Sequence, residues 1–197
     1  MAHIPLQVMP TKGHLFIISG PSGTGKSTIV KATLKKRPQL GYSISFTTRP
    51  PRVDEEDGVD YHFINEETFR KKIEANELAE WAEVHGHLYG TSARYIEETL
   101  ASGQDVLVDI DVEGTKRLSA RYPEAISVFI TPPTMIDLEK RLNRRGTDSS
   151  EVVARRLKSA EAEMAHVQCY DHVIVNDDLA KALLKLETVI EKACLNG

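Results

Sequence analysis

Residues 20–27 complete a phosphate-binding loop of the pattern GxxxxGK[ST], and they read Gly20-Pro21-Ser22-Gly23-Thr24-Gly25-Lys26-Ser27. The apolar run 14–19 before the loop suits a buried strand, and residues 27–36 after it contain no Pro or Gly and favour a helix. Glycines let the backbone turn tightly, so that its N–H groups surround a phosphate at the positive end of the helix dipole. This context predicts a nucleoside triphosphate site rather than a glycine-rich turn that binds nothing.

Two side chains of the loop indicate its chemistry. Lys26 can reach the β- and γ-phosphates, and the Ser27 hydroxyl can ligate Mg²⁺. We therefore expect ATP-type chemistry that depends on a divalent metal ion.

The composition is that of a soluble globular protein, with 197 residues, 41% hydrophobic and 27% charged. This length fits one α/β domain with insertions, or two small domains at most. A net charge of −4 argues against a nucleic-acid partner. No apolar run is long enough to cross a membrane, and the N-terminus has no secretion signal.

The sequence contains two cysteines, Cys169 and Cys194, too few for a disulfide framework or a metal-ligand cluster. We expect buried or inert thiols in a reducing compartment, with a regulatory disulfide as the alternative. A cytoplasmic location follows.

Alternating strand and helix patterns predict a parallel sheet covered by helices. The expected strands are Leu15–Ser19, Tyr42–Phe46, Val106–Ile110, Ile126–Thr131 and His172–Val175. The expected helices are Lys26–Lys36, Glu66–Asn76, Ser92–Ala101, Val112–Ala120, Met135–Arg144, Glu151–Ala165 and Leu179–Cys194. In such sheets ligands bind beyond the carboxyl ends of the strands, where the phosphate loop lies.

Two regions interrupt this alternation. Residues 45–91 contain short strand patterns and a hairpin around Gly86, and they predict an inserted small lobe. Residues 141–156 hold five arginines around a glycine, as is typical of a loop that covers a ligand. The core is then expected to comprise residues 13–44, 92–140 and 157–197, with residues 1–12 as an N-terminal extension for which disorder is one expectation.

Arg49 and Arg52 flank a stiff Pro-Pro pair and could hold two guanidinium groups against a second phosphate. The alternative, equally favoured by the spacing, is a pair of solvated arginines against the acidic run 54–57. Tyr61 and Tyr89 could donate hydroxyls to the same phosphate, although aromatic residues near strand ends more often pack in a core.

Glu80 precedes the single tryptophan, and period-two alternation puts it on a face with Leu78 and Ala82. A carboxylate among apolar neighbours needs a partner. The adjacent N1–H and N2–H₂ donors of guanine would suit it, whereas adenine offers an acceptor at N1. A solvent-facing glutamate is the alternative, and it is the favoured one when Glu80 is considered alone.

Acidic residues end the strand 106–111. An acid at this place commonly holds the Mg²⁺ of a phosphate-loop enzyme through water, which predicts a ligand-side role for Asp109 or Asp111. Asp111 could equally cap the following helix. Arginines could neutralise charge on a transferring phosphoryl group or form a solvated face, and they are Arg141, Arg144, Arg145, Arg155 and Arg156.

Together these motifs resemble guanylate kinase, in the family's order, from about residue 14 to the C-terminus. The segments that carry the resemblance are 18–27, 45–52, 58–63, 80–81, 89–91, 109–111, 141–147 and 175–178. The resemblance implies an α/β P-loop nucleoside monophosphate kinase fold, with a parallel sheet core flanked by helices, a GMP-binding lobe at about 45–91 and a lid at about 141–156.

The resemblance also implies roles for individual residues. The expected ATP-binding residues are Gly20, Pro21, Ser22, Gly23, Thr24, Gly25, Lys26, Ser27, Thr28 and Asn176, the last near the adenine. The expected GMP-binding residues are Ser45, Arg49, Arg52, Tyr61, Glu80, Tyr89, Thr91 and Asp111. The expected catalytic residues are Lys26, Arg49, Arg145 and Arg156, and the expected metal site is Ser27 with Asp109 through water.

The activity so implied is Mg²⁺-dependent transfer of the ATP γ-phosphoryl group to GMP, giving ADP and GDP. One alternative is a non-catalytic module of the same fold that binds phosphopeptides. Another is a related P-loop kinase for a different phosphorylated small acceptor. The sequence leaves open whether dGMP is accepted and whether the chain forms a homo-oligomer.

Overall fold

The computed structural model describes residues 12–84, 86–144 and 149–196. Residues 1–11 of the predicted N-terminal extension at 1–12, and the predicted lid residue Arg145, lie outside the described residues.

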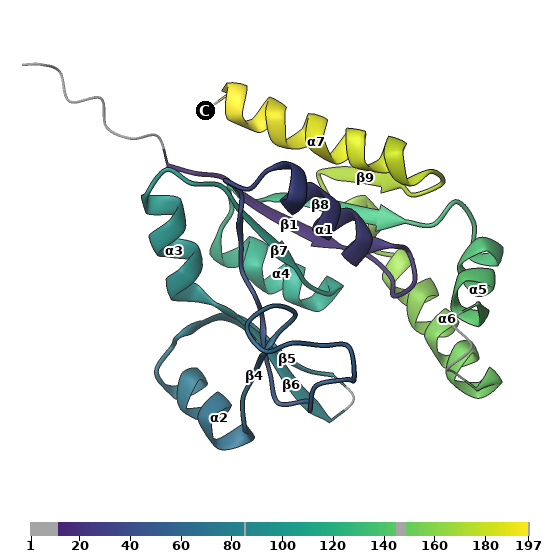
Figure 1. The fold of residues 1–197 in the computed structure, drawn as a ribbon, viewed down its shortest axis with the longest axis horizontal. Coiled ribbons are helices and arrows are strands. Elements are labelled where there is room, and N and C mark those ends of the chain that lie inside the picture. Colours follow the sequence, from purple (N-terminus) through teal and green to yellow (C-terminus); the bar gives the residue numbers. More distant parts are fainter. Residues whose placement is uncertain (1–11, 85, 145–148, 197) are drawn as a thin grey trace, which may run out of the picture.

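The described part of the chain contains a core sheet of five parallel strands, as the alternating pattern predicts (Figure 1). Their order across the sheet is β2 (Gly41–Tyr42), β7 (Val106–Asp109), β1 (Leu15–Ser19), β8 (Ile126–Thr131) and β9 (His172–Val175). Since all five strands run the same way, the ends of β1 and β7 lie at one edge of the sheet.

Helices cover both faces of this sheet (Figure 1). Helices α1 (Lys26–Lys36) and α7 (Leu179–Asn196) lie on one face. Helices α3 (Ala93–Ala101) and α4 (Val112–Arg121) lie on the other. Two-sided covering explains why the strands are apolar throughout instead of alternating with polar residues.

The central strand β1 supplies both hydrophobic cores. Phe16 and Ile18 pack in the core under α1 and α7, and Leu15 and Ile17 pack in the core under α3 and α4. Phe16, Ile17 and Ile18 are fully buried. The strand that precedes the phosphate loop is thereby held rigidly on both sides.

A second sheet of four strands forms the inserted lobe, in the order β4 (His62–Phe63), β3 (Phe46–Thr47), β6 (His87–Ser92) and β5 (Leu78–Val84). Helix α2 (Glu66–Glu74) packs against it through the fully buried ring of Phe69, which joins a small core of the lobe. Strands β5 and β6 form the hairpin predicted around Gly86.

The single strand predicted at 42–46 is wrong, because β2 and β3 belong to different sheets. The backbone changes partners within three residues. The Ser43 amide donates to the Leu107 carbonyl of the core at 3.0 Å, and the Ser45 carbonyl accepts from the His62 amide of the lobe at 2.9 Å. Residues 43–45 are therefore the crossing from core to lobe.

The predicted period-two alternation of β5 is wrong at Leu78. The pairing of β5 with β6 shifts register between Leu78 and Glu80. Leu78 consequently packs in the core of the lobe with Phe69, while Glu80 and Ala82 line a cavity on the other side.

Two helices that pack on each other make up most of the region predicted as a lid. Helix α5 (Met135–Asn143) contributes Leu138 and Leu142 to their shared core, and α6 (Ser150–Met164) contributes Val153 and Ala160. A 3₁₀ turn, η1 (Val167–Cys169), leads from α6 to β9. Among the helices of the described residues, none has the length and apolar character that crossing a bilayer requires.

The expectation that the cysteines are buried is wrong, because Cys169 and Cys194 are both exposed.

Helix α7 offers a matched test of the core. Leu186 is 0% exposed and Leu184 is 63% exposed. We predict that Leu186→Ala lowers the free energy of unfolding by about 2 to 5 kcal/mol, because it leaves a cavity under the sheet. Leu184→Ala should change it by less than about 0.5 kcal/mol. Urea unfolding followed by circular dichroism measures both, and equal effects would contradict the packing described.

Candidate active site

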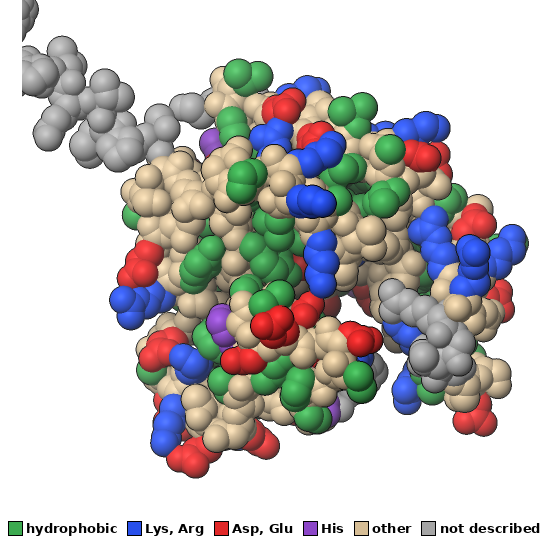
Figure 2. All heavy atoms as spheres, in the orientation of Figure 1, with side chains coloured by type: hydrophobic (Ala, Val, Ile, Leu, Met, Phe, Trp, Pro, Cys, Tyr) green, Lys and Arg blue, Asp and Glu red, His purple; other side chains and the backbone are tan. Residues whose placement is uncertain are grey.

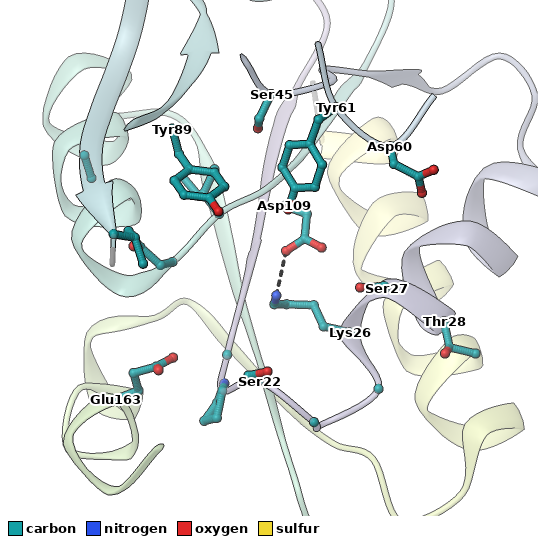
Figure 3. Close-up of a pocket in the computed structure, with 18 of the residues that line it drawn as sticks. Ser22, Lys26, Ser27, Thr28, Ser45, Asp60, Tyr61, Tyr89, Asp109 and Glu163 are labelled. Carbon is teal, nitrogen blue, oxygen red and sulfur yellow. Dashed lines mark ion pairs between the residues drawn. The ribbon is translucent and has the colours of Figure 1, made fainter. Parts of the chain in front are cut away.

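A cavity of about 440 Å³ opens where the core, the lobe and helix α6 meet. The surface is hollowed between the lobe and the lid helices (Figure 2), and the residues of the cavity converge from all three (Figure 3). Sixteen of the predicted site residues line it, and they are Gly20, Pro21, Ser22, Gly23, Gly25, Lys26, Ser27, Thr28, Ser45, Arg52, Tyr61, Glu80, Tyr89, Asp109, Asp111 and Arg156.

Four other predicted site residues do not line the cavity. They either contact a residue that lines it or belong to, or contact, the phosphate loop. Arg49 donates to Tyr89, and Thr91 donates to Glu80. Thr24 belongs to the phosphate loop, and its carbonyl accepts from Asn176.

The phosphate loop leaves the start of α1 open to a ligand. Side-chain caps close the starts of α2 to α6, supplied by Asn65, Ser92, Asp111, Thr134 and Ser149. Helix α1 begins instead at Gly25, which has a left-handed φ of 90°, and no described side chain caps it. The first amides of α1 are therefore available for an anion at the positive end of the helix.

Two side chains hold the loop from behind. The Asn176 amide donates to the Thr24 carbonyl at 2.6 Å, and Arg141 donates to the same carbonyl at 3.2 Å. Arg141 also donates to the Asn176 carbonyl at 2.7 Å. A Cβ at Gly25 would lie 2.4 Å from the Asn176 amide nitrogen, so this close contact requires glycine. Asn176 thus contacts the loop, and its placement near an adenine stays a prediction.

Lys26 forms an ion pair with Asp109 at the end of β7, with 2.8 Å between Nζ and Oδ1 (Figure 3). Burial by itself would lower the pKa of Lys26, but the Asp109 carboxylate outweighs it and the pKa is raised. Lys26 therefore remains a cation inside the cavity, as binding to a phosphate requires.

Asp111 caps a helix, as one of its two predicted roles requires, and its ligand-side role stays a prediction. Its side chain caps α4 by accepting from the Gly114 amide at 2.6 Å, and it also lines the cavity. A Cβ at Gly114 would lie 3.0 Å from Oε2 of Glu80 and 3.2 Å from Oδ1 of Asp111. The absence of a side chain there lets both carboxylates lie against the start of α4.

Glu80 is only 7% exposed, and the Thr91 hydroxyl donates to its carboxylate at 2.6 Å. Burial raises the pKa of Glu80 to about 7, and the nearby Asp111 charge adds to this rise, while Thr91 and Arg117 oppose it. The cavity therefore holds a buried carboxylate that one hydroxyl satisfies in part. The alternative of a solvent-facing Glu80 is wrong.

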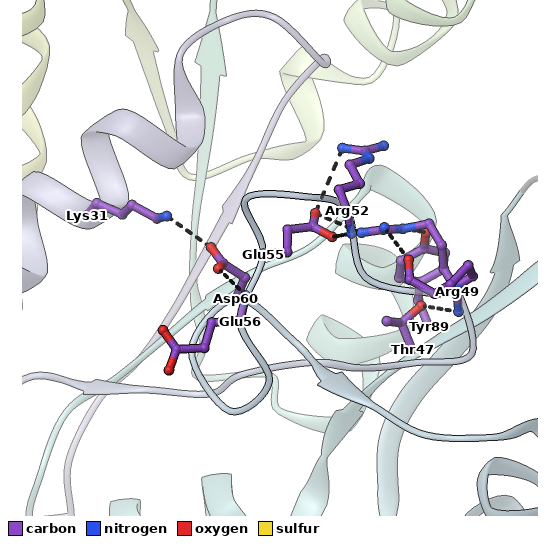
Figure 4. Close-up of polar contacts among 9 residues, drawn as sticks. Lys31, Thr47, Arg49, Arg52, Glu55, Glu56, Asp60 and Tyr89 are labelled. Atoms are coloured by element: carbon purple, nitrogen blue, oxygen red, sulfur yellow. Dashed lines mark hydrogen bonds and ion pairs between the residues drawn. The ribbon is translucent and has the colours of Figure 1, made fainter.

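Arg49 is held firmly on the lobe (Figure 4). Its guanidinium donates to Glu55 at 2.8 Å and to the Tyr89 hydroxyl at 3.2 Å, and it lies over the Tyr61 ring at 5.5 Å. The Arg52 side chain is more exposed, at 75%, and its guanidinium lies 3.9 Å from the Glu55 carboxylate. An acidic partner from the run 54–57 therefore contacts both arginines, and Arg52, Tyr61 and Tyr89 still face the cavity.

Three polar residues of the cavity were missed by the sequence reasoning, namely Tyr42, Asp60 and Glu163. Asp60 pairs with Lys31 of α1 at 2.9 Å, which joins the lobe to the core (Figure 4). Glu163 lies on α6, seven residues after Arg156. Two helical turns separate them, so this spacing was the available signal that both share one face of the helix.

Burial raises the pKa of Glu163; the Lys26 cation opposes this rise and Asp111 adds to it. Arg156 donates to the Ser22 hydroxyl at 2.5 Å. Helix α6 therefore places Arg156 against the phosphate loop and the Glu163 carboxyl in the same cavity.

Comparison with known proteins bears on this cavity. The family model described as guanylate kinase matches residues 12–193. The chain belongs to the guanylate kinase family. A guanylate kinase of Shewanella sp. (strain MR-7) is 50% identical over 190 residues, covering 96% of this chain and 92% of that one. A guanylate kinase of Dechloromonas aromatica is 48% identical over 184 residues, covering 93% of this chain and 91% of that one.

Solved structures agree with the family. The crystal structure of guanylate kinase from Anaplasma phagocytophilum matches with a TM-score of 0.78 and 29% identity, covering 93% of this chain and 87% of that one. A shikimate kinase from Bacteroides thetaiotaomicron matches with a TM-score of 0.51 and 15% identity, covering 90% of this chain and 98% of that one. The second likeness, at 15% identity, is one of fold alone.

The raised pKa of Glu80 predicts a pH-dependent stability. The ordinary pKa is 4.5 and the folded value is about 7, so the folded state keeps a proton that the unfolded chain releases. The resulting stabilisation is complete below pH 4.5 and is lost as the pH rises through 7.

Relative to Glu80→Gln, the wild type should therefore lose up to about 3 kcal/mol of unfolding free energy between about pH 5 and about pH 8. Urea unfolding across this range measures the difference. The exposed Glu83 of the same strand is the control, and Glu83→Gln should keep the wild-type profile. Parallel profiles for Glu80→Gln and wild type would contradict the buried carboxylate.

Proposed function

We propose that the cavity catalyses Mg²⁺-dependent transfer of the ATP γ-phosphoryl group to GMP, giving ADP and GDP. The observation that carries the proposal is that one cavity is lined by both the phosphate loop and the buried carboxylate of Glu80. The loop would hold the donor and the lobe the acceptor, and family membership supports this assignment.

The donor half rests on the loop amides and Lys26. The uncapped start of α1 and the Lys26 cation both face the cavity, so a triphosphate would find N–H donors and a fixed positive charge there. When ATP binds, its phosphate oxygens would replace the Asp109 carboxylate as partners of Lys26.

The proposed metal site consists of oxygen ligands. Mg²⁺ prefers hard oxygen ligands and retains several waters, and the Ser27 hydroxyl and Asp109 carboxylate of the cavity fit that preference. Ser27 would bind the ion directly and Asp109 through water. When bound, the ion would neutralise charge on the β- and γ-phosphates.

The acceptor half rests on Glu80 and the lobe. The Glu80 carboxylate lies in the cavity and accepts from the Thr91 hydroxyl, and its remaining acceptor capacity can take both N1–H and N2–H₂ of guanine. Ser45 would face O6, and Thr91 would keep Glu80 in place. The guanine donors would stabilise the ionised form of Glu80 and so offset part of the free energy that burial of its charge costs.

The acceptor phosphate would lie between Arg49, Arg52, Tyr61 and Tyr89. Its oxygens would take over the guanidinium contacts that Glu55 now makes, since phosphate oxygens match the same fork geometry. The two phosphates would then meet between Lys26 and the arginines.

The transfer itself requires no covalent enzyme intermediate. A phosphate of GMP is already a nucleophilic anion, so positioning and charge neutralisation would dominate the rate. Arg156 of α6, together with Arg145, would approach the phosphates as the lid closes, and closure would exclude water and suppress ATP hydrolysis. The proposal includes a cytoplasmic location, where ATP, GMP and Mg²⁺ are available together.

Replacing Lys26 tests the donor half. We predict that Lys26→Met lowers kcat by on the order of 10²- to 10³-fold, because a charge that stabilises the transferring phosphoryl group is lost. A coupled assay of ADP formation, with each substrate omitted in turn, measures this. Lys35→Met, at an exposed position of the same helix, is the control and should retain full activity. Near-normal turnover by Lys26→Met would refute the assignment.

Replacing Glu80 tests the acceptor half. We predict that Glu80→Gln lowers kcat/KM for GMP by on the order of 10²-fold, because charge-assisted hydrogen bonds to guanine are lost, while the KM for ATP changes by less than about threefold. Glu83→Gln should match wild type. Equal effects on both substrates would count against guanine recognition.

A panel of GMP, dGMP, AMP, CMP and UMP then compares the acceptors directly. Turnover with GMP and with none of the other ribonucleotides is the expected result. Failure of every nucleotide, together with binding of a phosphopeptide, would favour the non-catalytic module.

A further inference from the structure

Three side chains of types that can ligate a metal ion lie together at the end of the core sheet opposite the cavity. His14 immediately precedes β1, Asp105 immediately precedes β7, and Cys194 lies in the last turns of α7. One ligand atom from each lies within 4.8 Å of the other two. The phosphate loop follows β1, and Asp109 is the last residue of β7, so the cluster and the cavity are at opposite ends of these two strands.

The contacts within the cluster converge on Asp105. Its Oδ1 lies 3.0 Å from Nδ1 of His14, and its Oδ2 accepts from the Cys194 thiol at 3.2 Å. The residues are 91 and 89 positions apart in sequence, so only the fold brings them together.

We propose that His14, Asp105 and Cys194 form a binding site for a zinc-like divalent cation. An imidazole nitrogen, a carboxylate oxygen and a thiolate sulfur form a donor set that Zn²⁺ accepts, whereas Mg²⁺ prefers oxygen alone. In a tetrahedral zinc site, ligand atoms lie about 3.3 to 3.8 Å from each other. The separations in the cluster require only small side-chain movements to reach that geometry.

Two of the three ligands are held by the backbone. The His14 carbonyl accepts from the Val106 amide at 2.8 Å, as part of the ladder between β1 and β7. The His14 amide donates to Oδ1 of Asp105 at 2.8 Å, which fixes the orientation of the carboxylate. A cation would therefore find His14 and Asp105 held close to the positions that ligation requires, and small movements of the three side chains would complete the geometry.

The cluster is accessible from solvent. The side chains of His14 and Asp105 are 26% and 21% exposed, and Cys194 is exposed. Asp105 also lines a second cavity of about 350 Å³, together with Arg37 and Gln104. Three protein ligands with an open side leave room for a water as the fourth ligand, and the cavity supplies an access route.

The alternative is a metal-free hydrogen-bonded triad that ties α7 to the sheet. Both interpretations place the same atoms together, but they differ in what a cation does. A bound cation would cross-link the starts of β1 and β7 to the end of α7, elements that are adjacent in Figure 1. Since the unfolded chain has no such site, binding would stabilise the fold.

The test is a titration of the full, tag-free chain with Co²⁺, after treatment with a chelator, in anaerobic buffer. Cobalt bound by a thiolate has a charge-transfer band in the near ultraviolet, which oxygen and nitrogen ligands do not produce. We expect the wild type to develop this band with one equivalent of Co²⁺, and added Zn²⁺ to abolish it by competition.

Two cysteine variants form a matched pair. Cys194→Ser should lose the band, and Cys169→Ser, which removes the other exposed thiol, should keep it. His14→Ala should weaken binding by on the order of 10- to 100-fold. Free Zn²⁺ at about a hundredfold above its Kd should raise Tm by about 5 °C or more in wild type and Cys169→Ser, but not in Cys194→Ser.

Any other outcome would contradict the proposed cation site. A wild type without the band, or with a band that Cys194→Ser retains, would show that the three residues do not bind the cation together. An unchanged Tm on addition of Zn²⁺ would favour the metal-free triad. If His14→Ala fails to fold, the cysteine pair still decides the question.

Discussion

The parallel pairing of β1 with β7 is the constraint on which the rest of the site depends. The pairing sets Ile18 beside Asp109, so that the phosphate loop after β1 and the acid that ends β7 reach the same edge of the sheet. The 2.8 Å contact between Lys26 and Asp109 is its direct consequence. Burial of β1 on both faces prevents the strand from sliding or twisting out of this register, because any shift would expose apolar side chains on one face.

The inserted lobe places the carboxylate of Glu80 away from water. Glu80 is buried because a register shift in β5 turns it away from the lobe core and toward the cavity. Thr91 satisfies it in part, and Gly114 leaves the space that its oxygens occupy. Such an environment raises the free energy of the charged form, and a ligand with two adjacent N–H donors would lower it again. The preference for guanine would then come from the unfavourable burial of the Glu80 charge in the free protein, which guanine relieves.

The cations of the site already have protein partners. Arg49 donates to Glu55 on the lobe, and Arg156 of α6 donates to Ser22 of the phosphate loop. These contacts place the guanidinium groups near the cavity and limit their conformational freedom before a nucleotide arrives. They also mean that binding exchanges one set of oxygen partners for another, so that net affinity depends on the difference between phosphate and protein oxygens rather than on the full strength of either contact.

The sequence by itself determined the phosphate loop, the parallel core and the family, because residues 20–27 carry a local geometry and apolar runs identify buried strands. Only the tertiary structure decided the environment of each side chain. Glu80 is buried and Leu78 faces away from it because of a register shift, which no periodicity reveals. Glu163 joined the cavity, and Asn176 contacts the loop, through contacts between elements far apart in the chain. Local patterns encode backbone conformation, whereas burial, charge and partners depend on how distant segments pack.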